Sequence, residues 1–188
     1  MKDRFDCFVG IDWSGDKENW QKRLKIALAR PGSHPPKLVG DRWSRTKAVH
    51  WIRGLVENQT ALIGLDFAFG FPPCGIELNW EYAERMCCGD ANFYGGKFFT
   101  VANASHSHLL NSRWVPRSQP FIAHLRTTER VAAETKGAAP QSIFNAVGAA
   151  QVGPSSISGM RALLHVRQNF AGKVSIWPFD ELVAGRSA

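Results

Sequence analysis

Two segments far apart in the sequence share one pattern, and this pattern constrains the fold more than any other feature. In Val9-Gly10-Ile11-Asp12 and in Ile63-Gly64-Leu65-Asp66, a glycine, an apolar residue and an aspartate follow an apolar residue within a run typical of a β-strand. Aspartate is rare inside strands, and a buried carboxylate costs free energy unless it is paired or bound to a metal. Two of them on neighbouring central strands therefore indicate a shared cation, most simply a divalent ion with oxygen ligands. The alternative interpretation is that Asp12 and Asp66 each lie just past a strand and cap a turn.

The other elements are predicted from hydrophobic periodicity and from turn residues. The connections between the first three strands are too short for a crossover helix, so these strands are expected to form antiparallel hairpins. The apolar run at residues 60–69 is typical of a strand that is covered on both faces. The order of elements predicts an α/β fold with a mixed sheet and helices on its faces. We predict strands at residues 5–13, 24–29, 37–43, 60–69 and 173–178, and helices after a Ser44 or Thr46 cap, at 76–86, at 123–133 and, capped by Ser155 or Ser156, at 156–168.

Together with the two aspartate patterns, three further segments of the sequence resemble a known family. The chain resembles the ribonuclease-H-like superfamily and, within it, an uncharacterised family of predicted ribonuclease-H-like nucleases. The resemblance implies a ribonuclease-H-like mixed sheet of three antiparallel strands followed by parallel strands, with helices on both faces. It also implies a single domain over residues 1–188 with an irregular, partly helical insertion at 74–150. The matching segments are residues 10–15, residues 64–72, Leu125-Arg126-x-Thr128-Glu129, Val147-Gly148-x-x-Gln151-Val152-Gly153 and Val174-x-Ile176-Trp177-Pro178-Phe179-Asp180.

The same resemblance implies a catalytic metal site. Asp12 and Asp66 would be the catalytic carboxylates and would hold Mg²⁺ or Mn²⁺, since the superfamily uses two such ions roughly 4 Å apart to cleave a phosphodiester. Relatives continue into another acidic strand and a C-terminal helix with a further carboxylate, whereas this sequence stops at Ala188. We therefore expect either a C-terminally incomplete or shortened chain, or a third metal ligand from elsewhere. The candidates for that third ligand are Asp180, Glu129 and Glu181.

Substrate contacts are expected from three residues. Ser14 lies in the turn after the first strand, where a hydroxyl can contact a phosphate, and Arg126 and Glu129 belong to the third matching segment. The i,i+3 spacing of Arg126 and Glu129 suits a local ion pair equally well. A separate zinc site from His106 and His108 with Cys87 or Cys88 is disfavoured, because the cysteines lack the paired spacings of zinc modules.

Composition indicates the class of partner. The 188 residues include 23 Lys and Arg against 16 Asp and Glu, a net charge of +7, which favours a polyanion such as nucleic acid. Arg113 and Arg117, with neighbouring aromatic residues, suit phosphate and base contacts, although a solvated basic face explains them equally well. No apolar run approaches the ~20 residues of a membrane span. The four cysteines, without a signal peptide, are expected to be reduced thiols in a cytoplasmic protein.

Three functions remain open from the sequence. The first is a metal-dependent phosphodiester hydrolase, a nuclease, that acts on nucleic acid by a two-metal-type mechanism. The second is a nucleotide-binding or phosphotransfer protein of the actin-like ATPase type, which places a turn such as Ser14-Gly15 against phosphates. The third is a catalytically inactive nucleic-acid-binding module that keeps the fold, because a shared fold does not by itself fix a function.

Overall fold

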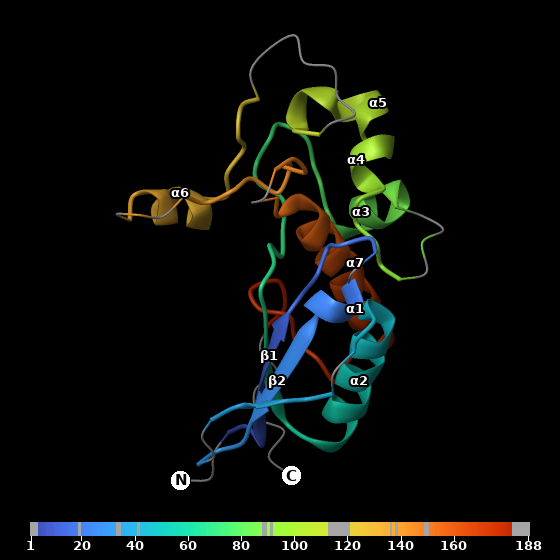
Figure 1. Cartoon of the computed structure of the whole chain (residues 1–188), viewed down its shortest axis with the longest axis vertical. Coiled ribbons are helices and arrows are strands. Elements are labelled where there is room, and N and C mark those ends of the chain that lie inside the picture. Colours follow the sequence, from blue (N-terminus) through green and yellow to red (C-terminus); the bar gives the residue numbers. More distant parts are fainter. Residues whose placement is uncertain are drawn as a thin grey trace.

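The structure is a computed structural model that describes residues 4–18, 20–32, 35–40, 42–87, 90, 92–112, 121–135, 137, 139–148 and 151–181. Its centre is a four-stranded sheet with the strand order β3-β2-β1-β4 (Figure 1). The α/β class, the mixed sheet and the antiparallel hairpins predicted from the sequence are confirmed. The strands β1 (Cys7–Asp12), β2 (Lys25–Ala29) and β3 (Lys37–Leu38) are antiparallel neighbours, and β4 (Ala61–Leu65) lies parallel to β1.

The third strand is much shorter than predicted, because the chain turns away from the sheet soon after Leu38. Gly40 has a positive φ of 64°, and the indole Nε1 of Trp43 donates a hydrogen bond to the Val39 carbonyl at 2.7 Å. This turn leads into α2 (Arg45–Asn58), which begins as predicted after Ser44. The Ser44 Oγ accepts a hydrogen bond from the backbone N–H of Lys47 at 2.9 Å and so caps the helix.

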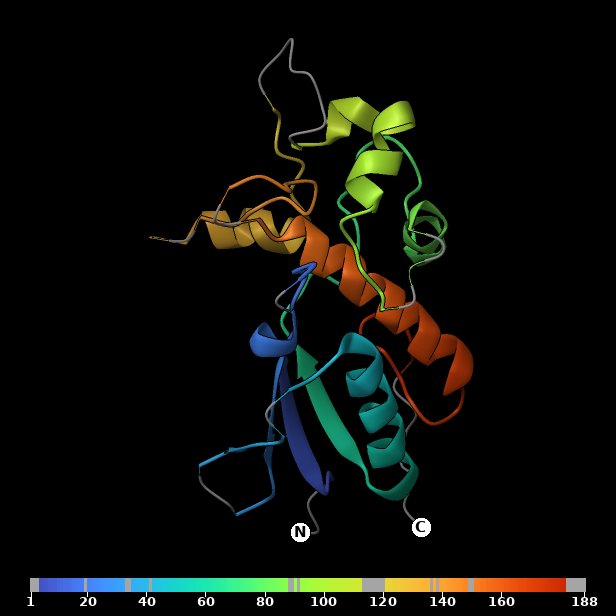
Figure 2. The same ribbon diagram turned by 45° about the vertical axis from the view of Figure 1, so that its right-hand side comes forward.

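Helices cover one face of the sheet. Val9, Ile11 and Ile26 are buried on that face, where α2 and α7 (Gly153–Asn169) pack on the same side (Figures 1 and 2). On the opposite face the exposed fractions of Phe8 and Leu62 are 42% and 52%. The prediction of helices on both faces is therefore wrong for the part of the chain that the structure describes. The apolar run of β4 alternates between half-buried and exposed positions instead of being covered on both sides.

The long helix α7 connects two hydrophobic clusters. One lies between the sheet, α2 and the C-terminal half of α7, and the other lies between the N-terminal half of α7 and the segments that follow β4. The helix begins at Gly153 after Val152, three residues earlier than predicted, and no side chain caps it. The Oγ of Ser155 is not the predicted cap, because it donates a hydrogen bond to the Val152 carbonyl at 2.9 Å.

The segment at residues 173–178 is not a strand, which corrects another prediction. The N–H of Ile176 donates to Oδ2 of Asp180 at 2.8 Å, and the carbonyl of Ile176 accepts hydrogen bonds from the N–H groups of Phe179 and Asp180. These backbone groups are used within a turn, so they are not available to a sheet. Among the described residues no helix has the length and apolar character needed to cross a membrane. The remaining helices are α1 (Trp20–Arg23), α3 (Trp80–Met86), α4 (Phe98–Val101), α5 (Asn103–His106), η1 (Ser107–Leu109) and α6 (Thr127–Ala133).

Candidate active site

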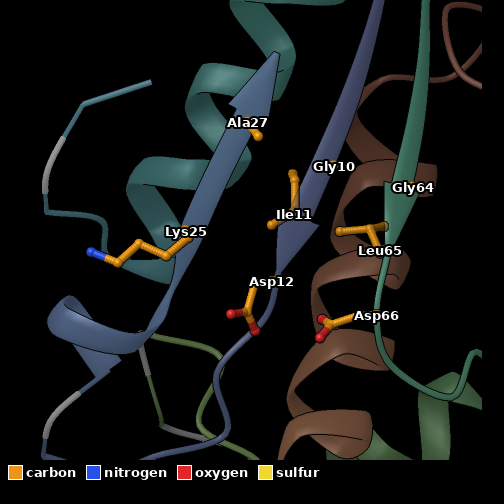
Figure 3. Close-up of a pocket in the computed structure, with 8 residues that line it drawn as sticks. All are labelled: Gly10, Ile11, Asp12, Lys25, Ala27, Gly64, Leu65 and Asp66. Atoms are coloured by element: carbon orange, nitrogen blue, oxygen red, sulfur yellow. The ribbon is translucent and has the colours of Figure 1, made fainter. Parts of the chain in front are cut away.

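The two aspartates of the repeated pattern lie side by side at one edge of the sheet. Asp12 is the last residue of β1, and Asp66 directly follows β4, whose last residue Leu65 is paired with Ile11. Because β1 and β4 are parallel, their carboxyl ends meet, and Figure 3 shows the two carboxylate groups facing each other. The backbone N–H of Trp13 donates to Oδ1 of Asp66 at 2.7 Å, which fixes that carboxylate relative to β1. Asp66 thus bonds a turn amide and also faces Asp12.

The surroundings disfavour two negative charges in this position. Partial burial raises the pKa of the Asp66 carboxyl above its ordinary value, and the charge of Asp12 raises it further, against the opposing effect of the Trp13 N–H. Neither aspartate forms an ion pair within the described part of the chain. Lys25 is paired with Asp12 in the β1–β2 register, but Figure 3 shows its ammonium group directed away from the carboxylates. A cation bound between them would relieve this repulsion.

The pair has the donor chemistry of a Mg²⁺ or Mn²⁺ site. Mg²⁺ usually keeps several waters and is held by one or two carboxylates together with substrate phosphates, so Asp12 and Asp66 suffice for such a site. No cluster of three metal-ligating side chains occurs among the residues that the structure describes. Asp180, the expected third ligand, lies in no such cluster here: its carboxylate forms an ion pair with Arg167 and accepts the N–H of Ile176. Glu181 is exposed and is not part of such a cluster either.

Two hollows meet at Asp66. The larger, of about 510 Å³, lies over the uncovered face of the sheet and is lined by residues of β1, β2 and the end of β4 (Figure 3). The smaller, of about 310 Å³, lies between Asp66, the start of α6 and the start of α7. Leu65 and Asp66 line both. The smaller cavity is completed by Phe67, Ala68, Arg126, Glu129, Pro140, Gln141, Val152, Ser155 and Ser156.

Arg126 and Glu129 thus line the same cavity as Asp66. They also form the local ion pair that their i,i+3 spacing allows. Nε and Nη2 of Arg126 donate to Oε1 of Glu129 at 2.9 and 2.7 Å, and the N–H of Arg126 donates to Oε2 at 2.8 Å. Both side chains are largely buried, with exposed fractions of 28% and 12%. Glu129 remains near Asp66 as an acidic residue of the cavity, with its charge balanced by Arg126.

Ser14 does not offer its hydroxyl to a substrate. The residue is buried, its Oγ accepts the N–H of Asp16 at 3.2 Å, and its carbonyl accepts Nε of Arg45 at 2.7 Å. Gly15 follows so close to α7 that a Cβ there would clash with the backbone of Ser155. The turn after β1 is therefore packed on the start of α7, where a phosphate has no direct access to Ser14.

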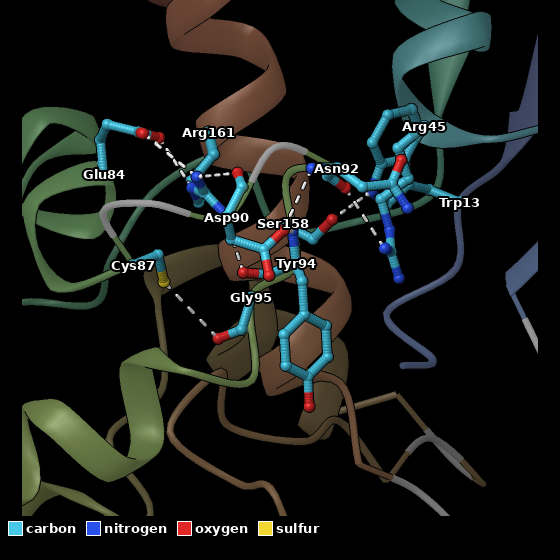
Figure 4. Close-up of polar contacts among 10 residues, drawn as sticks. All are labelled: Trp13, Arg45, Glu84, Cys87, Asp90, Asn92, Tyr94, Gly95, Ser158 and Arg161. Carbon is cyan, nitrogen blue, oxygen red and sulfur yellow. Dashed lines mark hydrogen bonds and ion pairs between the residues drawn. The ribbon is translucent and has the colours of Figure 1, made fainter. Parts of the chain in front are cut away.

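Two buried groups hold this turn. Arg45 donates to the carbonyls of Ser14, Asp16 and Asn92, and burial lowers the pKa of its guanidinium to about 10, which leaves it charged at neutral pH. The indole Nε1 of Trp13 donates to Oγ of Ser158 at 3.0 Å, which ties the end of β1 to α7 (Figure 4). Both contacts stabilise the segment whose Trp13 N–H orients Asp66.

His106 and His108 belong to no metal-ligating cluster among the residues that the structure describes. His106 lies in α5 and His108 in η1, so the two residues do not share a strand face. The Nδ1 of His106 lies 2.9 Å from the Tyr82 hydroxyl, and burial raises the pKa of the Cys87 thiol to about 11. A thiol with so high a pKa is a poor metal ligand. Cys88, like Arg113 and Arg117, lies outside the described residues.

The sequence did not predict the contact of the Trp13 N–H with Asp66 or the place of Pro140 and Gln141 in the smaller cavity. Nothing in the local sequence around Gln141 distinguishes it from an ordinary loop residue. Comparisons with known proteins gave no match to a family model, to a curated protein or to a solved structure. Functional inference for this chain therefore depends on the geometry of Asp12, Asp66 and the two hollows.

Proposed function

We propose that this protein is a metal-dependent phosphodiester hydrolase of the ribonuclease-H-like type that acts on nucleic acid. The observation that carries the proposal is the pair of facing carboxylates, Asp12 and Asp66, at the carboxyl ends of two adjacent parallel strands. The strand order supports the resemblance, because three antiparallel strands are followed by a parallel one. The net charge of +7 fits a polyanionic substrate.

The chain itself would supply position and electrostatics. Asp12 and Asp66 would hold Mg²⁺ or Mn²⁺, which when bound activates water and neutralises charge on the phosphate. Strand ends in a hydrogen-bonded sheet are rigid, and in-line attack on phosphorus tolerates little displacement of the groups involved. The Trp13 N–H keeps one oxygen of Asp66 in place. In the overall reaction a water oxygen bonds to phosphorus, the ester P–O bond breaks, and a proton passes to the leaving oxygen.

The structure offers less support to the nucleotide phosphotransfer alternative. That function needs the turn after β1 to contact phosphates, but the hydroxyl of Ser14 is buried and Gly15 is packed against Ser155. An inactive binding module would keep the basic charge and lose the need for paired carboxylates. It would therefore bind nucleic acid equally well after both aspartates are replaced by asparagine.

The test is hydrolysis of labelled single-stranded DNA, single-stranded RNA and duplex DNA with Mn²⁺, Mg²⁺ or EDTA. We expect Mn²⁺-dependent cleavage of at least one substrate, and a loss of at least about 100-fold in Asp12→Asn and Asp66→Asn, because each replacement removes a charged metal ligand. Asp180→Asn is the matched control and should keep most of the activity, since its carboxylate pairs with Arg167. Cleavage that survives in both asparagine variants, or no cleavage of any substrate, would contradict the proposal.

A further inference from the structure

We infer that the cavity between Asp66, α6 and α7 binds the terminal nucleoside of a single-stranded nucleic acid, so that cleavage at Asp12 and Asp66 releases one nucleotide at a time. This inference rests on the proposed hydrolase function and names its substrate class. It starts from the observation that Asp66 lines two hollows that meet there, one over the open face of the sheet and one beside the starts of α6 and α7. A phosphodiester likewise has a nucleoside on each side of the phosphorus.

The size of the cavity limits what it can hold. Its volume of about 310 Å³ lies at the lower end of the range for small-molecule sites, about 300–1,000 Å³. One nucleoside matches this volume, whereas a base pair or a second nucleotide would extend out of the hollow. The cavity therefore favours an unpaired chain end over a duplex or the interior of a long strand.

The lining suits a nucleoside better than a phosphate. Leu65, Phe67 and Val152 supply apolar surface, while Gln141 and Ser155 supply polar groups. A nucleoside has the same mixed character, and bases pack well on aromatic and apolar side chains. A planar, partly apolar group with polar edges is thus the expected occupant.

The charges of the cavity also favour a neutral nucleoside over a phosphate. The guanidinium of Arg126 is already paired with the carboxylate of Glu129 by two hydrogen bonds, so its charge is balanced. Asp66 adds a further negative charge at the mouth. A free phosphate would be repelled inside the cavity, whereas a phosphate at the Asp12–Asp66 pair would meet the bound cation there. The neutral nucleoside then extends into the cavity, and the rest of the strand leaves across the open face of the sheet.

The first experiment measures binding, without catalysis, by titration calorimetry with Mn²⁺ present. The probes are deoxyadenosine 5′-monophosphate and inorganic phosphate, added separately to the unmodified protein. We expect the nucleotide to bind at least tenfold more tightly than phosphate, because only the nucleotide fills the cavity. Equal affinities would overturn the inference, and this comparison needs no variant.

A cavity-filling variant locates the nucleotide. Gln141→Trp places a large ring in the cavity and should weaken nucleotide binding at least tenfold while Mn²⁺ binding stays unchanged. Gln168→Trp is the matched control, because Gln168 is exposed late on α7 and does not line the cavity. Circular dichroism verifies that both variants are folded. Unchanged nucleotide affinity in a folded Gln141→Trp protein would overturn the assignment.

The second experiment compares linear and circular single-stranded DNA of the same sequence with Mn²⁺. Degradation of the linear strand to mononucleotides, with the circle at least tenfold more resistant, supports the inference. Cleavage of the circle at a similar rate overturns it but leaves the hydrolase proposal intact. If neither DNA is cut and the nucleotide still binds more tightly than phosphate, the hydrolase proposal fails and the nucleoside cavity is retained.

Discussion

Replacing Asp66 by asparagine should stabilise the protein in the absence of metal, although it removes the proposed activity. The asparagine Oδ1 can still accept the Trp13 N–H, so the main change is the loss of a partly buried negative charge that also faces Asp12. Two like charges about 4 Å apart repel by about 1 kcal/mol in water and about 4 kcal/mol at an effective dielectric constant of 20. Because Asp66 is only partly buried, screening by solvent places the gain near the lower figure, about 1 kcal/mol.

The pH dependence has a definite sign. The pKa of Asp66 is raised in the folded protein, so the folded state binds a proton more readily than the unfolded chain. Stability of the natural protein is therefore lost as the pH rises through this raised pKa, whereas Asp66→Asn does not titrate. The advantage of the variant should be complete at neutral pH and should shrink as the pH falls towards the ordinary value of 3.8.

Thermal unfolding with and without Mn²⁺ provides the assay. For a chain of this size about 1 kcal/mol corresponds to a Tm increase of about 2–4 °C for Asp66→Asn at neutral pH in EDTA. Mn²⁺ should reverse the order of the two Tm values. At a Mn²⁺ concentration of ten times Kd, binding stabilises only the natural protein, by about 1.4 kcal/mol. Asp180→Asn should lower Tm instead, since Asp180 is paired with Arg167. A lower Tm for Asp66→Asn in EDTA would refute the idea of unrelieved repulsion.

Three further predictions concern the segment that orients Asp66. Arg45→Ala should lower the free energy of unfolding by about 3 kcal/mol or more in urea titrations, because one buried and two partly buried carbonyls lose their donor. Gly15→Ala should cost about 1–3 kcal/mol, since its Cβ would clash with the Ser155 backbone, whereas Gly10→Ala has open space and should be neutral or slightly stabilising in the same titration. Ser158→Ala leaves the Trp13 indole N–H without its acceptor and should cost about 1–2 kcal/mol and weaken Mn²⁺ binding measured by calorimetry.

The sheet and the aspartate pair could be predicted because their signals are local. β1 and β4 are short runs of strand-forming residues that end at glycine-containing turns, and α2 has a serine cap followed by apolar residues at helical spacing. Short connections fix the hairpins, and a helical connection makes β4 parallel to β1. Asp12 and Asp66 lie at the carboxyl ends of two neighbouring parallel strands, so their proximity follows from the sheet geometry.

The features that could not be predicted depend on contacts between distant segments. The uncovered face of the sheet is not visible in the apolar sequence of β4, because a half-covered strand and a fully covered strand can have the same composition. Asp180 is acidic and lies in a matching segment, but only the fold pairs it with Arg167. Arg126 and Asp66 line one cavity beside the starts of α6 and α7, and the sequence carries no pattern that predicts this.

The most direct test of the central claim is anomalous diffraction from crystals of the protein soaked in Mn²⁺. We predict a Mn²⁺ peak between the carboxylates of Asp12 and Asp66, within about 2.0–2.3 Å of an oxygen of each. The same peak should be absent from crystals of Asp66→Asn soaked at the same concentration. Two outcomes would contradict a metal-dependent function at this pair. One is well-ordered Asp12 and Asp66 carboxylates with no Mn²⁺ peak between them, and the other is a Mn²⁺ peak only at another place in the protein.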